Sequence, residues 1–247
     1  TSSEINFVSS LQSSLKPDFN PLKSSILSQV NAQLSNKTYP TTGNVKVLTM
    51  LIDYPDLNNT YPKSNFDSLL YGANYRSGDG SFKTFYETAS NGVITVDVDV
   101  VGWYRAANNY TYYSRDSGYD RAADLVREAV DAAENAGVNF AQYDNDNDGD
   151  VDGVLVVHAG PGAESGSQTQ FIWSHRWVMN GGNLGSVTYD GKFINDYMMN
   201  PETRGSLTNP RMVGIGVFCH EFGHNLGLPD LYDTDPANGD SEGIGNW

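Results

Sequence analysis

The sequence predicts an α/β (α+β) domain, in which a twisted mixed sheet is supported by a backing helix and by a second helix that carries reactive side chains. Two short runs of aliphatic and β-branched residues, 45–52 and 153–158, have the length and composition of buried strands. Residues 119–136 and 210–226 have apolar side chains at helical spacing and predict the two long helices. Alternation of such segments along one chain favours a single layered core.

Composition restricts the class of protein. The chain has 247 residues, of which 38% are hydrophobic, so it can bury a full core. Its net charge of −15 excludes nucleic acid and anionic membranes as natural partners and favours divalent cations. No apolar run is long enough for membrane insertion, and no signal-peptide pattern remains at the N-terminus, so we expect any leader to have been removed. The one cysteine, Cys219, excludes an internal disulfide.

The elements of the first half follow from local patterns. Residues 1–43 have apolar side chains at helical spacing and predict two short amphipathic helices that end at Pro40. The strand at 45–52 marks the start of the main domain. A helix at 81–90 and an alternating strand at 93–101 come next.

The second half begins with the helix at 119–136, for which Gly137 is the expected stop. An acidic loop then leads into the strand at 153–158. Further strand-like pieces cover 170–177 and 186–198, and together these segments predict a mixed sheet.

The helix at 210–226 carries the main chemical signal. Asn209 and Pro210 are typical of a helix start, and Gly227 is typical of a helix end. On such a helix His220 and His224 lie one turn apart on one face, so both imidazoles can bind one zinc ion.

Glu221 lies beside this pair and is the expected general base. It can take a proton from a zinc-activated water, which attacks a peptide carbonyl, and can pass the proton to the leaving amine. The alternative is a structural helix with two incidental histidines, and the H-E-x-x-H spacing disfavours it.

The third zinc ligand is predicted from the continuation of the motif. Gly227 and Asp230 occupy the places where the metzincin pattern H-E-x-x-H-x-x-G-x-x-H has its glycine and its third ligand, so Asp230 is the expected ligand in a metzincin-like zincin catalytic domain. A thermolysin-like arrangement would use Glu242 instead, but the segment before it has no helical pattern. Asp233 is a lesser candidate.

Several further stretches are similar to one family. With the zinc motif at 220–233, the chain resembles the immune inhibitor A family of secreted bacterial metallopeptidases. The stretches are LIDYPD at 51–56, SFKTFY at 81–86, VVGWY at 100–104, DGV at 152–154 with HAG at 158–160, and IWSH at 172–175. The resemblance implies a calcium-stabilised zinc endopeptidase that is exported with a signal peptide and an N-terminal prosegment, and that acts on proteins or peptides outside the bacterial cell.

The same resemblance bears on domain organisation. Residues 1–43 are expected to be a prosegment remnant or the mature N-terminus, and 44–247 to be the catalytic domain. Family members continue into a methionine turn after a stretch like the one that ends here at Trp247. We therefore expect a further C-terminal portion of the polypeptide, with which this chain associates.

The acidic loop predicts a calcium site. Carboxylates occupy loop positions 1, 3, 5, 7 and 9, and Gly149 occupies position 6, as in an EF-hand loop. Position 12 is Leu155, so this is a calcium loop that borrows a ligand from elsewhere, and the alternative is a solvated acidic turn. The expected ligands are Asp144, Asp146, Asp148 and Asp152 through their side chains and Asp150 through its carbonyl.

Three other residues are expected to be structural. Cys219 lies about 100° round the helix from His220 and is predicted to be a buried filler. His158 and His175 lie in strand-like runs and are expected to be hydrogen-bonded core histidines rather than a second metal site. The competing functional class is a catalytically inactive, calcium-stabilised surface-binding module on the same fold, which would have no need of Glu221.

Overall fold

The computed structural model describes residues 40–73, 75, 80–114, 121–165 and 170–228. The two helices predicted before Pro40 lie outside these residues, so they stay predictions.

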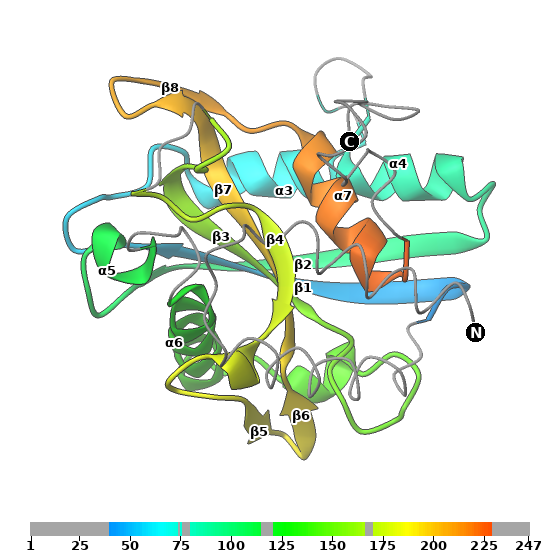
Figure 1. Ribbon diagram of the computed structural model, residues 1–247. Coiled ribbons are helices and arrows are strands. Elements are labelled where there is room, and N and C mark those ends of the chain that lie inside the picture. The colour runs from blue at the N-terminus through cyan, green and yellow to red at the C-terminus, as the bar shows by residue number, and fades with distance from the viewer. Residues whose placement is uncertain (1–39, 74, 76–79, 115–120, 166–169, 229–247) are drawn as a thin grey trace, which may run out of the picture.

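A mixed sheet forms the centre of the molecule (Figure 1). Its strand order is β2-β1-β3-β7-β4, with β8 paired to the far end of β7. The first four strands in this order are parallel, whereas β4 and β8 run antiparallel to β7. The bounds are β1 Gly43–Asp53, β2 Ile94–Arg105, β3 Val154–Pro161, β4 His175–Val178, β7 Asp196–Ser206 and β8 Asn209–Met212. The predicted fold class, with its mixed sheet, is confirmed.

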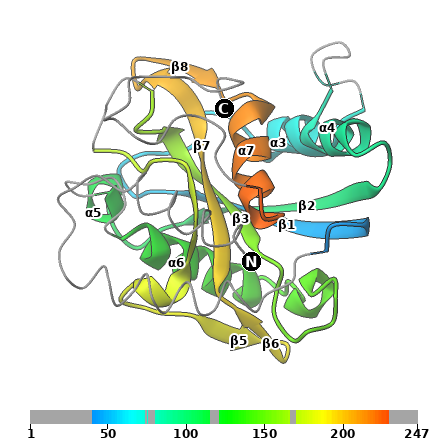
Figure 2. The ribbon, with the colours of Figure 1, turned by 45° about the vertical axis from the view of Figure 1, so that its right-hand side comes forward.

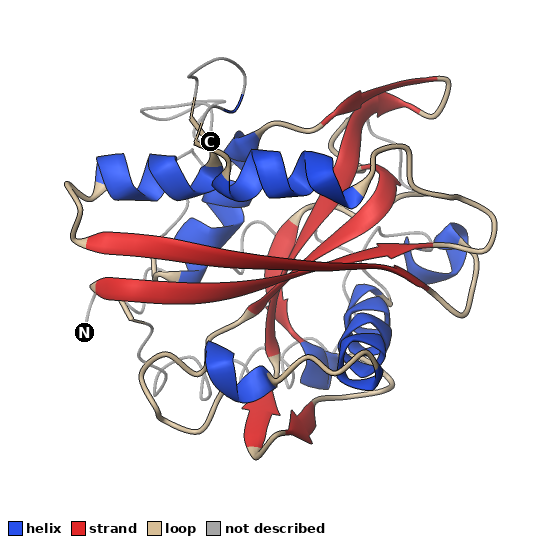
Figure 3. Ribbon diagram, turned by 180° about the vertical axis from the view of Figure 1, so that it is seen from behind, coloured by secondary structure: helices blue, strands red, loops and turns tan. Residues whose placement is uncertain are grey.

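Helices cover both faces of this sheet (Figures 2 and 3). Side chains alternate between the faces along β1, so Leu48 and Met50 belong to one core and Val47 and Leu51 to the other. The first core is closed by α6, Ala122–Asn135. The second core is closed by α3 Lys63–Tyr71, α4 Phe82–Ala89 and α7 Ile215–Asn225.

Most predicted elements are present close to their expected bounds. The helix expected at 81–90 is α4, which begins with a capping box between Ser81 and Thr84. The helix expected at 119–136 is α6, and Gly137 follows its end with a positive φ of 85°. The shorter elements are α5 Tyr110–Ser114, η2 Phe140–Tyr143, η3 Met179–Gly181, β5 Val187–Tyr189 and β6 Lys192–Ile194.

The start of the last helix was predicted wrongly. Asn209 and Pro210 belong to β8, in which Pro210 lies opposite Gly205 of β7, and α7 begins only after Gly214. An Asn-Pro pair can start a turn or a short edge strand as well as a helix. Pairing with the end of β7 selects the strand here.

Two further differences concern strand lengths and a missed helix. The piece expected at 186–198 is divided, because Asp190 and Gly191 both have positive φ and turn β5 into β6 as a hairpin. The piece expected at 170–177 forms a strand only from His175 onward. The helix α3 was not predicted, although Phe66, Leu69 and Leu70 have the i, i+3, i+4 spacing that would indicate it.

Candidate metal centre and acidic loop

Helix α7 is held against α4 by aromatic side chains. Phe222 packs edge-on against Phe82 and Tyr86, with ring centroids 5.2 and 5.0 Å away. The Tyr86 hydroxyl donates a hydrogen bond of 2.5 Å to the backbone carbonyl of Cys219. Burial raises the pKa of Tyr86, so this hydroxyl stays a proton donor. Because Phe222 faces the core, the opposite side of the helix is left to His220 and its neighbours.

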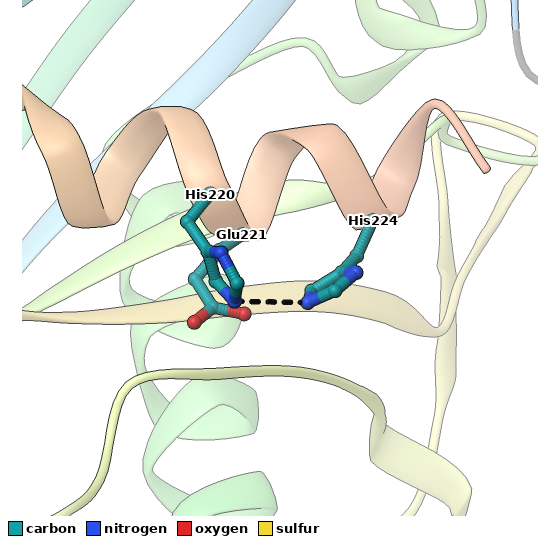
Figure 4. A group of neighbouring side chains, drawn as sticks. All are labelled: His220, Glu221 and His224. Atoms are coloured by element: carbon teal, nitrogen blue, oxygen red, sulfur yellow. Dashed lines mark hydrogen bonds between the residues drawn. The ribbon is translucent and has the colours of Figure 1, made fainter. Parts of the chain in front are cut away.

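The predicted histidine pair converges on one point (Figure 4). The Nε2 atoms of His220 and His224 lie 3.1 Å apart, and a carboxylate oxygen of Glu221 lies within 4.8 Å of one nitrogen atom of each ring. Glu221 is buried, with 4% of its surface exposed, whereas the histidines are half-buried. The three side chains predicted from the motif are therefore brought together.

The end of α7 fixes the orientation of His224. Gly227 has a φ of 87°, and the helix closes with hydrogen bonds from Gly227 N to the His224 carbonyl and from Leu228 N to the Gly223 carbonyl. The turn places the Leu228 carbonyl 2.9 Å from Nδ1 of His224. Because a carbonyl can only accept, Nδ1 carries the proton, and the lone pair of Nε2 is directed toward His220.

This arrangement fits zinc. Two imidazole nitrogens bound to a tetrahedral zinc ion at about 2.0 to 2.1 Å lie about 3.3 Å apart, close to the 3.1 Å found between the two Nε2 atoms. The hydrogen bond at Nδ1 is the usual second contact of a zinc-binding histidine. The candidates for the third ligand, Asp230, Asp233 and Glu242, lie outside the described residues.

The acidic loop brings together some of the predicted calcium ligands. Carboxylate oxygens of Asp144, Asp146 and Asp152 lie within 4.8 Å of one another. Asp148 is not in this group, and its carboxylate accepts a hydrogen bond of 2.9 Å from the backbone N–H of Asp150. Asp144 and Asp152 are buried, so burial of their charges favours a bound cation.

A lysine that the sequence analysis did not consider also reaches the loop. Nζ of Lys192, on β6, lies 2.5 Å from Oδ2 of Asp144. Burial raises the pKa of Asp144, but the hydrogen bonds from Lys192 and from the backbone N–H groups of Gly149 and Asp148 outweigh burial, and the net pKa lies below its usual value. Asp144 is thus ionised, and any cation in the loop has to share it with Lys192. Nothing in the local sequence places Lys192 here.

Of the three residues expected to be structural, Cys219 and His158 are buried and His175 is half-buried. Cys219 is buried, and burial raises the pKa of its thiol to about 12. His175 is hydrogen-bonded through Nε2 to the Tyr197 hydroxyl at 2.9 Å, and His158 lies 3.0 Å through Nδ1 from the Ala159 carbonyl. Burial lowers the pKa of both histidines to about 4, so both are neutral near pH 7. Across the described ranges, no helix has the length and apolar character needed to cross a bilayer.

Known proteins match most of the chain. Residues 35–247 match the family model described as immune inhibitor A peptidase M6, catalytic domain. The chain is 32% identical to Immune inhibitor A of Bacillus thuringiensis subsp. alesti, over 82% of this chain and 35% of that protein. It is also 32% identical to the pre-pro-metalloprotease PrtV of Vibrio cholerae, over 82% of this chain and 26% of that protein. The chain thus spans about a quarter to a third of the length of these relatives.

Proposed function

Because the chain belongs to the immune inhibitor A family of M6 peptidases, we propose that it is the zinc-dependent catalytic domain of an endopeptidase that hydrolyses peptide bonds in proteins. The observation that carries the proposal is the convergence of the Nε2 atoms of His220 and His224 beside the Glu221 carboxylate. A histidine that only packs in the core or lies on the surface does not require a second imidazole nitrogen and a carboxylate beside its own ring nitrogen. A histidine that binds a metal ion does.

Each residue of the motif has a separate role. His220 and His224 would hold zinc through Nε2, and zinc when bound polarises the substrate carbonyl and lowers the pKa of a water molecule. Glu221 accepts the proton from the attacking water and passes it to the leaving amine. The low exposure of Glu221 keeps its carboxylate from bulk water. The hydrogen bond from His224 to the Leu228 carbonyl keeps the imidazole in the tautomer that can bind a metal.

Asp230 is proposed as the third ligand. Gly227 turns the chain back at the end of α7, as the motif requires, and Asp230 follows three residues later. The thermolysin-like alternative with Glu242 predicts a different outcome for one experiment. Asp230→Ala should abolish tight zinc binding and Glu242→Ala should leave it intact, and the reverse result would assign Glu242.

We further propose that the acidic loop holds calcium. Asp144, Asp146 and Asp152 supply carboxylates that already lie close together, and Asp148 and Asp150 are the remaining candidates. Hard cations with oxygen ligands match this donor set, whereas zinc prefers nitrogen and sulfur. Calcium should raise the melting temperature, and an identical melting temperature with and without calcium would remove this proposal.

The relatives suggest the setting in which the domain acts. A protein whose name includes Immune inhibitor A and another named pre-pro-metalloprotease support a secreted bacterial protease that is made as a zymogen. Since both are much longer than this chain, we propose that the domain acts together with a further C-terminal portion. Its substrates are proteins or peptides, and the excess of acidic residues disfavours nucleic acid as a partner.

The experiment that tests the function uses the isosteric change Glu221→Gln. We expect one zinc ion in both the wild type and the variant, and casein hydrolysis only in the wild type, with a loss of at least about 100-fold in the variant. Glu134→Gln on α6, on the opposite face of the sheet, is the matched control and should keep full activity. Zinc without hydrolysis in the wild type would favour the inactive binding module, and a wild type without zinc would overturn the proposal.

A further inference from the structure

We propose that Asn225 is a positioning residue for the metal centre, because it ties the last turn of α7 to the end of the acidic loop. This inference rests on the proposed zinc function of His220 and His224. It assigns a role to a residue that neither binds the metal nor contacts the reacting atoms.

The contact between Asn225 and the loop is specific. The Nδ2 atom of Asn225 donates a hydrogen bond of 2.7 Å to the backbone carbonyl of Asp152. Asn225 is 4% exposed, and among the described residues its Oδ1 has no hydrogen-bond partner. Because a backbone carbonyl can only accept, Nδ2 must face Asp152. One bond therefore fixes the orientation of the whole amide.

The loop leaves space for this amide at Gly153. A Cβ atom at position 153 would lie 3.0 Å from Oδ1 and 3.1 Å from Nδ2 of Asn225, closer than a side chain tolerates without displacement. Gly153 also has a φ of 123°, which disfavours any other residue. The Asn225 side chain thus packs closely against the backbone of residues 152 and 153.

This part of the loop is connected to the sheet by hydrogen bonds. The Asp152 carboxylate accepts hydrogen bonds from Nδ2 and the backbone N–H of Asn145, at 2.9 and 2.6 Å. Asn145 in turn bonds to both backbone groups of Lys46 on β1. A chain of hydrogen bonds therefore runs from the central sheet through the loop to the helix end.

The position of Asn225 gives this bond a chemical consequence. It follows His224 directly, and the helix is held at the other side of the motif by the bond from Tyr86 to Cys219. The two bonds enclose the histidine pair, so the helix can neither rotate nor slide without breaking one of them. Loss of the Asn225 bond releases the turn that carries His224, and the Nε2 atoms then no longer hold their 3.1 Å separation.

The test compares Asn225→Leu with a matched asparagine elsewhere in the core. Asn195 is also 4% exposed, and its Oδ1 accepts a hydrogen bond of 3.1 Å from the backbone N–H of Asn180. Zinc affinity is measured by competition with a chromogenic chelator, and geometry by the visible absorption of the cobalt(II)-substituted protein. Thermal unfolding of the metal-free proteins measures stability separately.

We expect Asn225→Leu to weaken zinc binding about tenfold and to change the cobalt(II) spectrum, whereas Asn195→Leu lowers the melting temperature with wild-type affinity and spectrum. If Asn225→Leu fails to fold, Gly153→Ala provides the same disturbance from the loop side. Its control is Gly137→Ala, because Gly137 also has positive φ but, among the described residues, has no atom within 4 Å of its Cβ position. Unchanged affinity and spectrum at both 225 and 153, or equal losses in the controls, would overturn the inference. A wild type that binds no zinc would instead overturn the proposed function.

Discussion

The backbone carbonyl of Asp152 accepts a hydrogen bond of 2.7 Å from the side chain of Asn225, so the acidic loop directly contacts the helix that carries the histidine pair. The carboxylate of Asp152 belongs to the group of three that could hold calcium. One residue therefore contributes its side chain to one candidate metal site and its backbone to the support of the other. Ordering of the loop by a cation should thus order the end of α7.

The first prediction is a coupling between the two metals. Calcium should raise the zinc affinity of the wild type about fivefold, and by linkage zinc should raise calcium affinity by the same factor. In Asn225→Leu both effects should disappear, because the bond that connects the loop to the helix is gone. Calorimetric titration of each metal with and without the other measures the coupling. Equal coupling in the variant would mean that the two metal sites are coupled through contacts other than the hydrogen bond of Asn225.

The second prediction concerns the bond at the other side of the motif. Tyr86→Phe keeps the ring contacts with Phe82 and Phe222 but removes the hydrogen bond to the Cys219 carbonyl. Unfolding free energy should fall by about 1 kcal/mol, as measured by urea denaturation of the metal-free protein. Tyr112→Phe, at a tyrosine that is 38% exposed, serves as control and should change stability little. A loss no larger than in the control would show that the buried hydroxyl contributes nothing.

The third prediction concerns Lys192. Lys192→Met keeps the length of the side chain and removes the charge that pairs with Asp144. Calcium affinity should rise about tenfold, because a cation near Asp144 no longer meets a second positive charge a few ångströms away. Without calcium the melting temperature should fall, since buried Asp144 loses its ion pair. Lys63→Met breaks a surface pair with Asp67 and should alter neither property. Weaker calcium binding in Lys192→Met would refute competition between the two cations.

The fourth prediction is a dependence of stability on pH. Burial lowers the pKa of His158 from 6.5 to about 4, so the unfolded chain binds a proton more readily between these values. Its contribution to stability is complete above pH 6.5 and is lost as pH falls toward 4, reaching a loss of about 3 kcal/mol. Urea denaturation of the metal-free wild type and of His158→Gln over this range measures the contribution of His158 by difference. Parallel curves for the two proteins would contradict it. The comparison is needed because burial raises the pKa of Glu202, which acts in the opposite direction.

Sequence patterns predicted the elements whose signal is local. The strands β1, β2 and β3 have aliphatic or alternating runs, and the helix α6 has an amphipathic repeat. Sequence patterns gave the wrong element where the same residues suit two local structures equally well. Asn209 and Pro210 suit a helix start or a strand, and only the free end of β7 decided between them. In the same way, Asp190 and Gly191 needed the pairing of β5 with β6 to become a hairpin turn.

For the candidate site, the sequence by itself determined the histidine pair, since a spacing of four residues on a helix puts His220 and His224 on one face. It also determined the glycine that ends the helix and the spacing of the acidic side chains. Only the tertiary structure decided what holds them. Asn225 and Asp152 are 73 residues apart, and Tyr86 and Cys219 are 133 apart. Contacts over such separations depend on which face of the sheet each helix covers. The periodicity of a short segment shows which side of the helix is buried, but not which face of the sheet that side covers.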